Sequence, residues 1–281
     1  MLTQSQSALD LQEMAPILPR PAARDVSPPN PPIETVNVWG LPLARMDTAA
    51  VLARIDDLIE RGDPAFFITA NLHYARLSAR EPQLCDVNSR AAFITADGMP
   101  MIWYSRLTGR PLPQRVAGSE LVEILSRRAE ERGYRVFFLG GAEGVARRAA
   151  DRLLARHPRL AVAGVEAPEF SRMKASDHAA LVRRIRSTRP DILFAALGQP
   201  KGELWIDRHC AAMGVPACVQ VGASLDFIAG SARRAPRWMQ RAGAEWLYRM
   251  AREPRRLAPR YFRDAMFLCG ATARDFTRGG R

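Results

Sequence analysis

Residues 91–100 read AAFITADGMP, an apolar run that ends on the acid Asp97. Residues 65–74 read AFFITANLHY and have the same form, with an apolar run that leads into Thr69 and Asn71. Short apolar runs bounded by turn residues predict buried strands. Two predicted strands of this chain therefore end in polar side chains.

Strand-like and helical patterns alternate along most of the chain. The strand-like runs read VNVWG, FFIT, AFITA, YRVFFLG, LAVAGV, DILFAALG and ACVQVGA. Helical patterns cover 48–61, 71–80, 120–132, 143–156, 177–187 and 203–213, with a further helix after Pro100. This alternation predicts an α/β fold with a mainly parallel, Rossmann-like sheet and helices on both faces. In such folds, ligands bind at the carboxyl ends of the strands.

Composition divides the chain into three parts. Residues 1–34 include PRPAARDVSPPNPPIE, and this proline density predicts a disordered extension. Residues 35–230 carry the alternating pattern and form the predicted α/β domain. Residues 231–281 hold 13 arginines against four acids, so that this tail carries +9 of the net charge of +12. We expect the tail to form a helical appendage.

The charge of the tail indicates its partner. A near-neutral body with a basic tail favours an anionic surface or ligand, although a solvated basic helix would have the same composition. From Trp238 onward, aromatic and apolar side chains lie among arginines, as in segments that bind the headgroup region of anionic membranes. Pro254 and Pro259 are expected to break the tail helix into movable pieces. We predict that the tail docks on a membrane; permanently packed helices are the alternative.

The cysteines and the N-terminus favour a cytoplasmic location. Cys85, Cys210, Cys218 and Cys269 show neither zinc-site nor disulfide-framework spacing. The first residues lack the apolar core of a signal peptide, and no run approaches the ~20 apolar residues of a membrane span. We therefore expect a cytoplasmic protein that is peripheral on the inner face of the plasma membrane.

Polar and glycine residues follow several predicted strands. Asp97, Thr69 and Asn71 come from two strand ends and are expected to face one cleft, with capping of the following helices as the alternative explanation. Glycine-rich turns that open helices favour phosphate groups. The residues at the other three strand ends are Gly140, Gly141, Gly198, Lys201, Glu203, Gly222 and Asp226. Their spacing matches neither a Rossmann fingerprint nor a P-loop.

Several motifs are absent from the sequence. It contains no DxD pair, no GxSxG elbow and no HExxH motif. The four scattered histidines are expected to be surface or core residues rather than ligands. We predict no metal and no cofactor, so cationic side chains and helix N-termini must neutralise a bound diphosphate. Two other functions are the alternatives. A dinucleotide-dependent oxidoreductase should show a GxGxxG motif, which this sequence does not contain. A nucleic-acid-binding protein should show a recognisable binding module, which is also absent from the sequence.

Eight motifs together resemble a known family. In order they are TANLHYARLS, ITADGMPMIW, RVAGSELV, VFFLGGAEGV, DILFAALGQPKGELWI, VGASLDFIAG, RRAPRW and AEWLYRMAREPRRLAPRY. Over roughly residues 36–263 the chain is similar to the WecG/TagA/CpsF family of bacterial glycosyltransferases. The resemblance implies transfer of a hexosyl unit from a UDP-sugar to an undecaprenyl-diphosphate-linked sugar, with inversion and without a metal. UDP-glucose, UDP-N-acetylmannosamine and its uronic acid remain open as donors, and so does a homo-oligomeric state.

The resemblance also implies roles for individual residues. It makes Asp97 the general base and places Thr69, Asn71 and Arg115 near the sugar or the acceptor. It also implies a nucleotide side of the cleft. The residues on that side are Gly140, Gly141, Gly198, Lys201, Glu203, Gly222 and Asp226. It further implies that the tail closes over the site and that three tail arginines touch the diphosphate: Arg249, Arg256 and Arg260.

One position departs from the family pattern. Family members usually read PKQE where this chain has Pro200, Lys201, Gly202 and Glu203. We expect the glycine to remove an amide contact and to affect the choice of donor.

Overall fold

The computed structural model describes residues 32–236, 238–239 and 243–279. Residues 1–31 of the predicted extension lie outside this described part. The strands are β1 Thr35–Val38, β2 Leu41–Ala44, β3 Phe66–Ala70, β4 Ile94–Ala96, β5 Arg135–Gly140, β6 Ala161–Glu166, β7 Ile192–Ala196 and β8 Ala217–Gln220. The helices of the first half are α2 Thr48–Arg61, α3 Leu72–Ser78, α4 Pro82–Arg90, α5 Met99–Leu107 and α6 Gly118–Arg132. Those of the second half are α7 Val145–Arg156, the 3₁₀ turn η1 Phe170–Arg172, α8 Ala175–Thr188, α9 Lys201–Met213, α10 Ser224–Ala229, α12 Glu245–Arg252 and α13 Pro254–Gly279.

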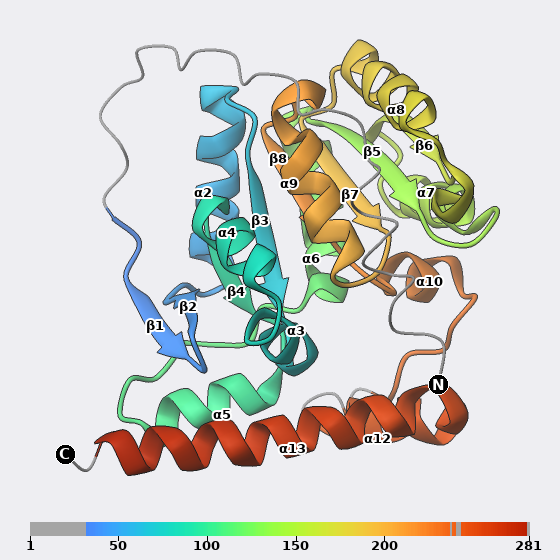
Figure 1. Cartoon of the computed structure of the whole chain (residues 1–281). Coiled ribbons are helices and arrows are strands. Elements are labelled where there is room, and N and C mark those ends of the chain that lie inside the picture. Colours follow the sequence, from blue (N-terminus) through green and yellow to red (C-terminus); the bar gives the residue numbers. More distant parts are fainter. Residues whose placement is uncertain (1–31, 237, 240–242, 280–281) are drawn as a thin grey trace.

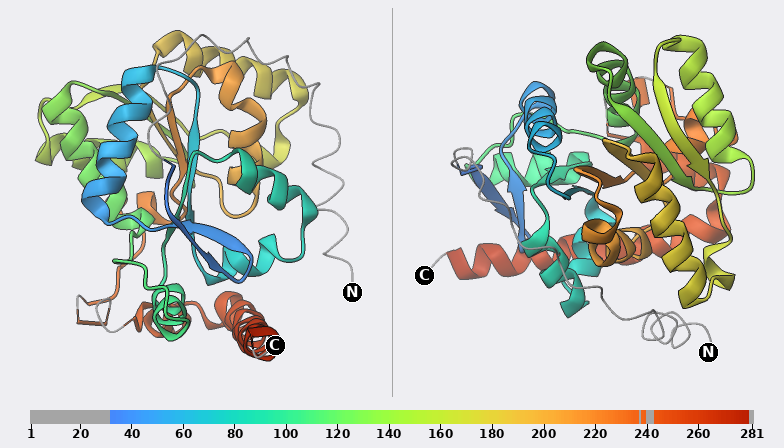
Figure 2. Two further views of the ribbon diagram at one scale, coloured as in Figure 1. Left: turned by 90° about the vertical axis from the view of Figure 1, so that its left-hand side faces the viewer. Right: turned by 90° about the horizontal axis from the view of Figure 1, so that it is seen from above.

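Six strands form one parallel sheet in the order β4-β3-β8-β7-β5-β6. Helices cover both of its faces (Figures 1 and 2). The central strands are buried on both sides, which explains why β3 and β7 are continuous apolar runs rather than alternating ones. The predicted α/β class and parallel sheet are thus confirmed.

Capping residues set several helix boundaries where the sequence predicts them. Asp47 accepts a hydrogen bond from the Ala50 amide at 2.8 Å and begins α2. Gly62, with φ of 70°, ends it in the left-handed conformation that favours glycine. The predicted helix over 48–61 is therefore confirmed at both ends.

The run VNVWG does not join the main sheet, contrary to its place in the predicted alternation. β1 pairs antiparallel with β2 in a separate hairpin. Trp39 and Gly40 form its two-residue turn with φ values of 51° and 89°, the backbone that tight hairpins require. Trp39 packs on Tyr104 of α5 and Phe267 of α13, with ring centroids 4.9 and 6.2 Å away. The hairpin tip thus links two distant helices.

The tail forms a helical layer below the carboxyl edge of the sheet, as the helices at the foot of Figure 1 show. α12 ends at Arg252 and α13 begins at Pro254, but Pro259 lies inside α13. The prediction that Pro259 breaks the helix is therefore wrong. This proline is close to the helix start, where few hydrogen bonds are lost, and the buried side chains of Leu257 and Asp264 hold the helix on either side.

A buried ion-pair cluster attaches the tail to α3. Arg76 Nε donates to Asp264 Oδ1 at 2.6 Å, and His73 Nδ1 lies 3.2 Å from the same oxygen. Burial acts to raise the pKa of Asp264, but its hydrogen bonds with His73 and Arg76 hold the pKa below its usual value. The tail thus packs on the body in this structure. The division of the chain at residue 230 remains a prediction.

Candidate active site

The ends of β3 and β4 are level, and this brings polar residues from the two strands together. Ala70 pairs with Ala96, and the Asp97 amide donates to the Ala70 carbonyl at 2.7 Å. A Cβ atom at Gly118 would lie 3.1 Å from Thr69 Oγ1 and 3.6 Å from Asp97 Oδ2. The side chains of Thr69 and Asp97 therefore meet at the start of α6, a proximity that the sequence predicted.

Asp97 has the surroundings of a group that exchanges a proton. Its Oδ2 accepts a hydrogen bond from the Gly118 amide at 3.2 Å. Burial raises the pKa of Asp97 to about 7, while the Gly118 hydrogen bond and the charge of Arg115 act in the opposite direction. The following helix is capped by Gly98 without a side chain, so capping of α5 does not account for the acid. A carboxyl with a pKa near neutrality is suited to general-base catalysis.

Asn71 and Thr69 both have structural partners. Asn71 Oδ1 accepts from the Tyr74 amide at 3.0 Å and caps α3, so the capping explanation holds for this residue. Thr69 Oγ1 donates to the Gln220 carbonyl at 3.4 Å. Their predicted roles toward the sugar remain predictions.

Arg115 belongs to an ion-pair group that the sequence analysis missed in part. Glu120, in the first turn of α6, accepts from Arg115 Nη2 at 2.7 Å and from Arg234 Nη2 at 2.9 Å. Arg234 Nε also lies 4.0 Å from Glu245 of α12. Arg234 stands in the motif RRAPRW, which was the available signal. It connects the vicinity of Asp97 to the tail.

The other half of the sheet edge is lined by glycine turns. Gly140, Gly141, Gly198 and Gly222 all have positive φ, between 56° and 91°. The Gly141 amide donates to the Ala196 carbonyl at 2.9 Å, which joins the turns after β5 and β7. A Cβ atom at Gly198 or Gly222 would meet nothing within 4 Å, so these two turns border open space. Their backbone can approach a ligand closely.

Lys201 and Glu203 both lie in the first turn of α9, but they differ in exposure to solvent. Lys201 is exposed, whereas the Glu203 residue is only 2% exposed. Burial raises the pKa of Glu203 to about 8, and its hydrogen bonds with the backbone and with Gln199 act against this. Glu203 Oε2 has no hydrogen-bond partner. The structure therefore does not bring these two residues together on one surface.

Gly202 makes room for the side chain of Gln220. A Cβ atom at position 202 would lie 2.4 Å from Gln220 Cδ and 2.8 Å from its Nε2. Gln220 Oε1 accepts from the Leu197 amide at 3.1 Å and so supports the turn before α9, while Nε2 is buried without a partner. The space beside Gly202 thus holds an amide group from β8, which the sequence did not predict.

Two of the three predicted tail arginines act electrostatically on Asp226. Burial raises the pKa of Asp226, and the charges of Arg249 and Arg256 counteract it. The Arg249 guanidinium also lies 5.6 Å from the Phe227 ring centroid. Arg260 is mostly buried and has its Nε 3.7 Å from Asp264 Oδ2 within the tail. The fold therefore places positive charge from the tail beside the turn after β8.

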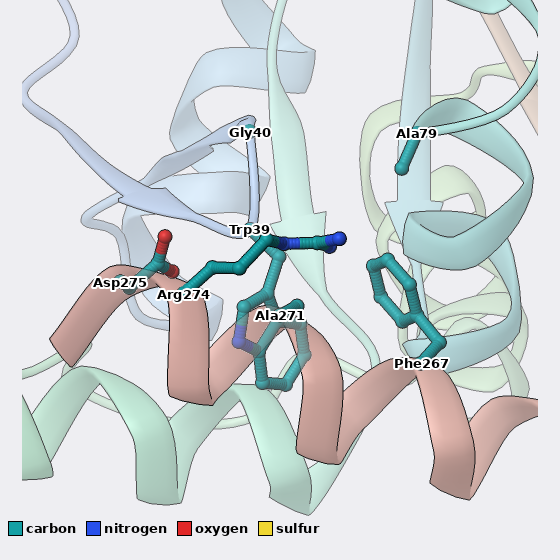
Figure 3. Close-up of a pocket in the computed structure, with 7 residues that line it drawn as sticks. All are labelled: Trp39, Gly40, Ala79, Phe267, Ala271, Arg274 and Asp275. Carbon is teal, nitrogen blue, oxygen red and sulfur yellow. The ribbon is translucent and has the colours of Figure 1, made fainter. Parts of the chain in front are cut away.

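A pocket of about 400 Å³ lies elsewhere, between the hairpin tip, α3 and α13. Its lining residues are Trp39, Gly40, Ala79, Phe267, Ala271, Arg274 and Asp275. Figure 3 shows the Arg274 side chain crossing it above Trp39 toward Phe267. None of the predicted site residues lines this pocket.

Across the part of the chain that the structure describes, no group of three or more His, Cys, Asp or Glu residues is arranged to hold a metal ion. Within the same residues, no helix combines the length and the apolar character needed to cross a bilayer.

Comparison with known proteins identifies relatives of this chain. It is 31% identical over 198 residues to an N-acetylglucosaminyldiphosphoundecaprenol N-acetyl-beta-D-mannosaminyltransferase of Bacillus spizizenii, which covers 70% of this chain and 75% of that protein. A protein of the same name from Bacillus subtilis is 26% identical over 223 residues, covering 79% and 85% of the two chains. One from Staphylococcus aureus is 29% identical over 192 residues, covering 68% and 74%.

The family comparison agrees with these relatives. Residues 36–280 match the model of the glycosyl transferase WecG/TagA/CpsF family, which includes the sheet, its carboxyl edge and the tail. The chain therefore belongs to the WecG/TagA/CpsF family and is a glycosyltransferase.

Proposed function

We propose that this enzyme transfers a hexosyl unit from a UDP-sugar to a sugar linked to undecaprenyl diphosphate, with inversion and without a metal. The observation that carries the proposal is Asp97, a carboxyl with a pKa near 7 held by the Gly118 amide at the carboxyl edge of the sheet. Inverting transfer needs a base that takes the proton of the acceptor hydroxyl as its oxygen attacks the anomeric carbon. The ionised form of Asp97 supplies that base.

The leaving group requires positive charge. As the bond from the anomeric carbon to the UDP oxygen breaks, negative charge grows on the diphosphate, and preorganised arginines stabilise it. The charges of Arg249 and Arg256 act on Asp226 in α10, the helix that follows the Gly222 turn. Their position supports a role at the diphosphate, with the tail completing the site. Arg260 is the third arginine of this proposal.

The relatives favour one donor among those left open. Their shared name specifies an N-acetylmannosaminyl group and an N-acetylglucosaminyl-diphosphoundecaprenol acceptor. We therefore place UDP-N-acetylmannosamine before UDP-glucose and the uronic acid. An acceptor of this kind is embedded in a bilayer, which supports a peripheral position on the inner face of the plasma membrane.

A donor panel tests the proposal. The purified full chain is mixed with each UDP-sugar and a synthetic N-acetylglucosaminyl-diphospho-lipid, and mass spectrometry records the product. We expect one hexosyl addition that survives EDTA. Absence of transfer from every UDP-sugar would refute the reaction, and a rate lost in EDTA but restored by magnesium would refute metal independence. Binding of UDP, compared with NAD and RNA, checks the ligand class directly.

A further inference from the structure

Among the described residues, the exposed large apolar side chains belong to the tail and to α5. Among the described residues, the large hydrophobic side chains with substantial exposure are Trp103, Leu107, Trp238, Trp246, Leu247, Phe262 and Met266, each between 43% and 69% exposed. Five of them belong to the tail. Trp103 and Leu107 belong instead to α5, which lies within the α/β body. Exposed apolar groups gathered in one region mark an interaction surface.

α5 has its apolar residues on both sides. Met101, Ile102 and Tyr104 are buried against the body. Trp103 and Leu107, four positions apart, share the opposite face of the helix. A surface helix normally has polar residues on that face, and the core packing of α5 does not require these two.

α5 and the tail are physically joined in this layer. Tyr104 of α5 donates a hydrogen bond to Asp275 of α13, and Trp39 packs between Tyr104 and Phe267. A Cβ atom at Gly243 would lie 2.9 Å from Met99 Cβ and 3.1 Å from Trp103 Cη2, so this part of the tail packs along α5. Figures 1 and 2 show α5, α12 and α13 together beneath the sheet. We call this surface the base layer.

The outward face of α13 carries the same chemistry. Leu257, Asp264 and Ala271 are its buried residues. Phe262 and Met266, 69% and 61% exposed, fall on the side of the helix away from them. The outward apolar side chains of α13 and α5 therefore stay largely exposed in the described chain, although the Trp103 ring approaches Gly243.

The charge of this layer selects the partner. From residue 98 to residue 119 the chain contains Arg106, Arg110 and Arg115 and no acid. Arg106 and Arg110 are exposed beside Trp103 and Leu107. The tail contributes nine further net positive charges over residues 231–281. Tryptophan and leucine among arginines suit the interface of a bilayer that contains anionic lipids.

We infer that α5 is a second docking element, and that the base layer as a whole, rather than the tail alone, binds an anionic lipid bilayer. Membrane binding by α5 does not depend on the proposed reaction, but its consequence for sugar transfer rests on the proposed function. Gly98 caps α5 directly after Asp97, so a bilayer bound to α5 fixes the height of the proposed base above the membrane surface. A lipid-linked acceptor would then reach Asp97 without leaving the membrane.

The test compares vesicle binding of the full chain and two variants. Trp103→Ser/Leu107→Ser and Arg106→Glu/Arg110→Glu change exposed residues only, and thermal unfolding checks that both fold. The probe is co-sedimentation with vesicles of phosphatidylcholine containing 30% phosphatidylglycerol. We expect each variant to bind about 10-fold more weakly. Arg183→Glu/Arg186→Glu, on the exposed face of α8, is the matched control and should bind as the wild type does.

The outcomes separate the inference from the proposed reaction. Wild-type vesicle binding by both α5 variants would overturn the inference, and so would equal binding of the wild type to pure phosphatidylcholine. The apolar variant should keep transfer to a short-chain soluble acceptor while losing transfer to acceptor in vesicles. If the wild type transferred no sugar to either acceptor, the proposed reaction would fail, and the sedimentation result would still decide the role of α5.

Discussion

Asp97 after β4 and Glu203 after β7 are both acids with raised pKa values, about 7 and about 8, yet they stand in different regions of the same sheet edge. Asp97 meets Thr69 and the amide of Gly118 at the start of a helix. Glu203 is enclosed in the first turn of α9, and one of its oxygens has no partner.

The difference shows that a perturbed pKa does not by itself identify a catalytic acid or base. Burial is the main cause of the raised pKa in both residues. Asp97 is only partly buried and feels the charge of Arg115, which Glu120 joins to Arg234 of the tail. Glu203 follows Gly202 in the sequence, and the side chain of Gln220 fills the space beside that glycine. Access to a substrate distinguishes the two regions.

The largest effect should come from exchanging each acid for its amide. Asp97→Asn is expected to lower turnover by at least ~100-fold because it removes the general base, while the affinity for UDP changes little. Glu203→Gln preserves the shape of a carboxyl that should be protonated below pH 8 and is expected to lower turnover less than ~10-fold. Steady-state kinetics and calorimetry with UDP check both variants. Near-normal turnover of Asp97→Asn would sink the assignment of the base.

The next effect concerns the positive charge that the tail adds to the nucleotide region. Arg249→Ala should lower transfer to a soluble acceptor by about 10- to 100-fold, since it removes a group placed to stabilise the leaving diphosphate. Arg252→Ala, on the same helix but over the Tyr248 ring, is the control and should have a much smaller effect. Vesicle binding of Arg249→Ala should stay close to that of the wild type. Equal losses in the two variants would indicate a general effect of charge.

Local patterns predicted much of this molecule, and long-range contacts account for most of what they missed. Apolar runs and helical periodicity depend on neighbouring residues, so the six parallel strands and the ends of α2 could be predicted. The hairpin of β1 and β2 could not, because four-residue strands do not indicate which partner they pair with. Arg234 and Glu120 are 114 positions apart, and only the fold brings them into contact.

The site shows the same division. The polar ends of β3 and β4 predicted the meeting of Thr69 and Asp97, because adjacent parallel strands end at one edge. The packing of Gln220 on Gly202 depends on the order of β7 and β8 within the sheet. From the sequence alone, Gly202 therefore predicted only the loss of an amide contact.

This packing gives a smaller, sharper test of the β7 region. Gly202→Gln places a side chain where Gln220 lies, and Gln220→Ala removes the acceptor of the Leu197 amide. Each change should weaken UDP binding by about 10-fold through the turn before α9. Gly202→Gln/Gln220→Ala returns an amide to the same space and should recover much of this loss.

A double-mutant cycle decides whether the two positions act together. If the two residues are coupled, the double variant should bind UDP more tightly than the product of the two single losses predicts. The donor panel should be repeated on all three variants, because the exchange is expected to alter the preference among UDP-sugars as well as the affinity. Independent, multiplying losses would show that Gln220 and Gly202 do not share one role.

The smallest effect is on stability, and its pH dependence separates the two acids once more. The pKa of Asp97 rises from an ordinary value of 3.8 to about 7 on folding, and that of Glu203 from 4.5 to about 8. The folded protein therefore holds more protons than the unfolded chain between these limits, and each acid costs stability as the pH rises through its window. Urea unfolding should show Asp97→Asn gaining on the wild type from pH 4 to pH 7 and then levelling off. For Glu203→Gln the gain should continue to pH 8. If both differences stayed constant with pH, neither carboxyl would have the raised pKa on which the comparison of the two regions depends.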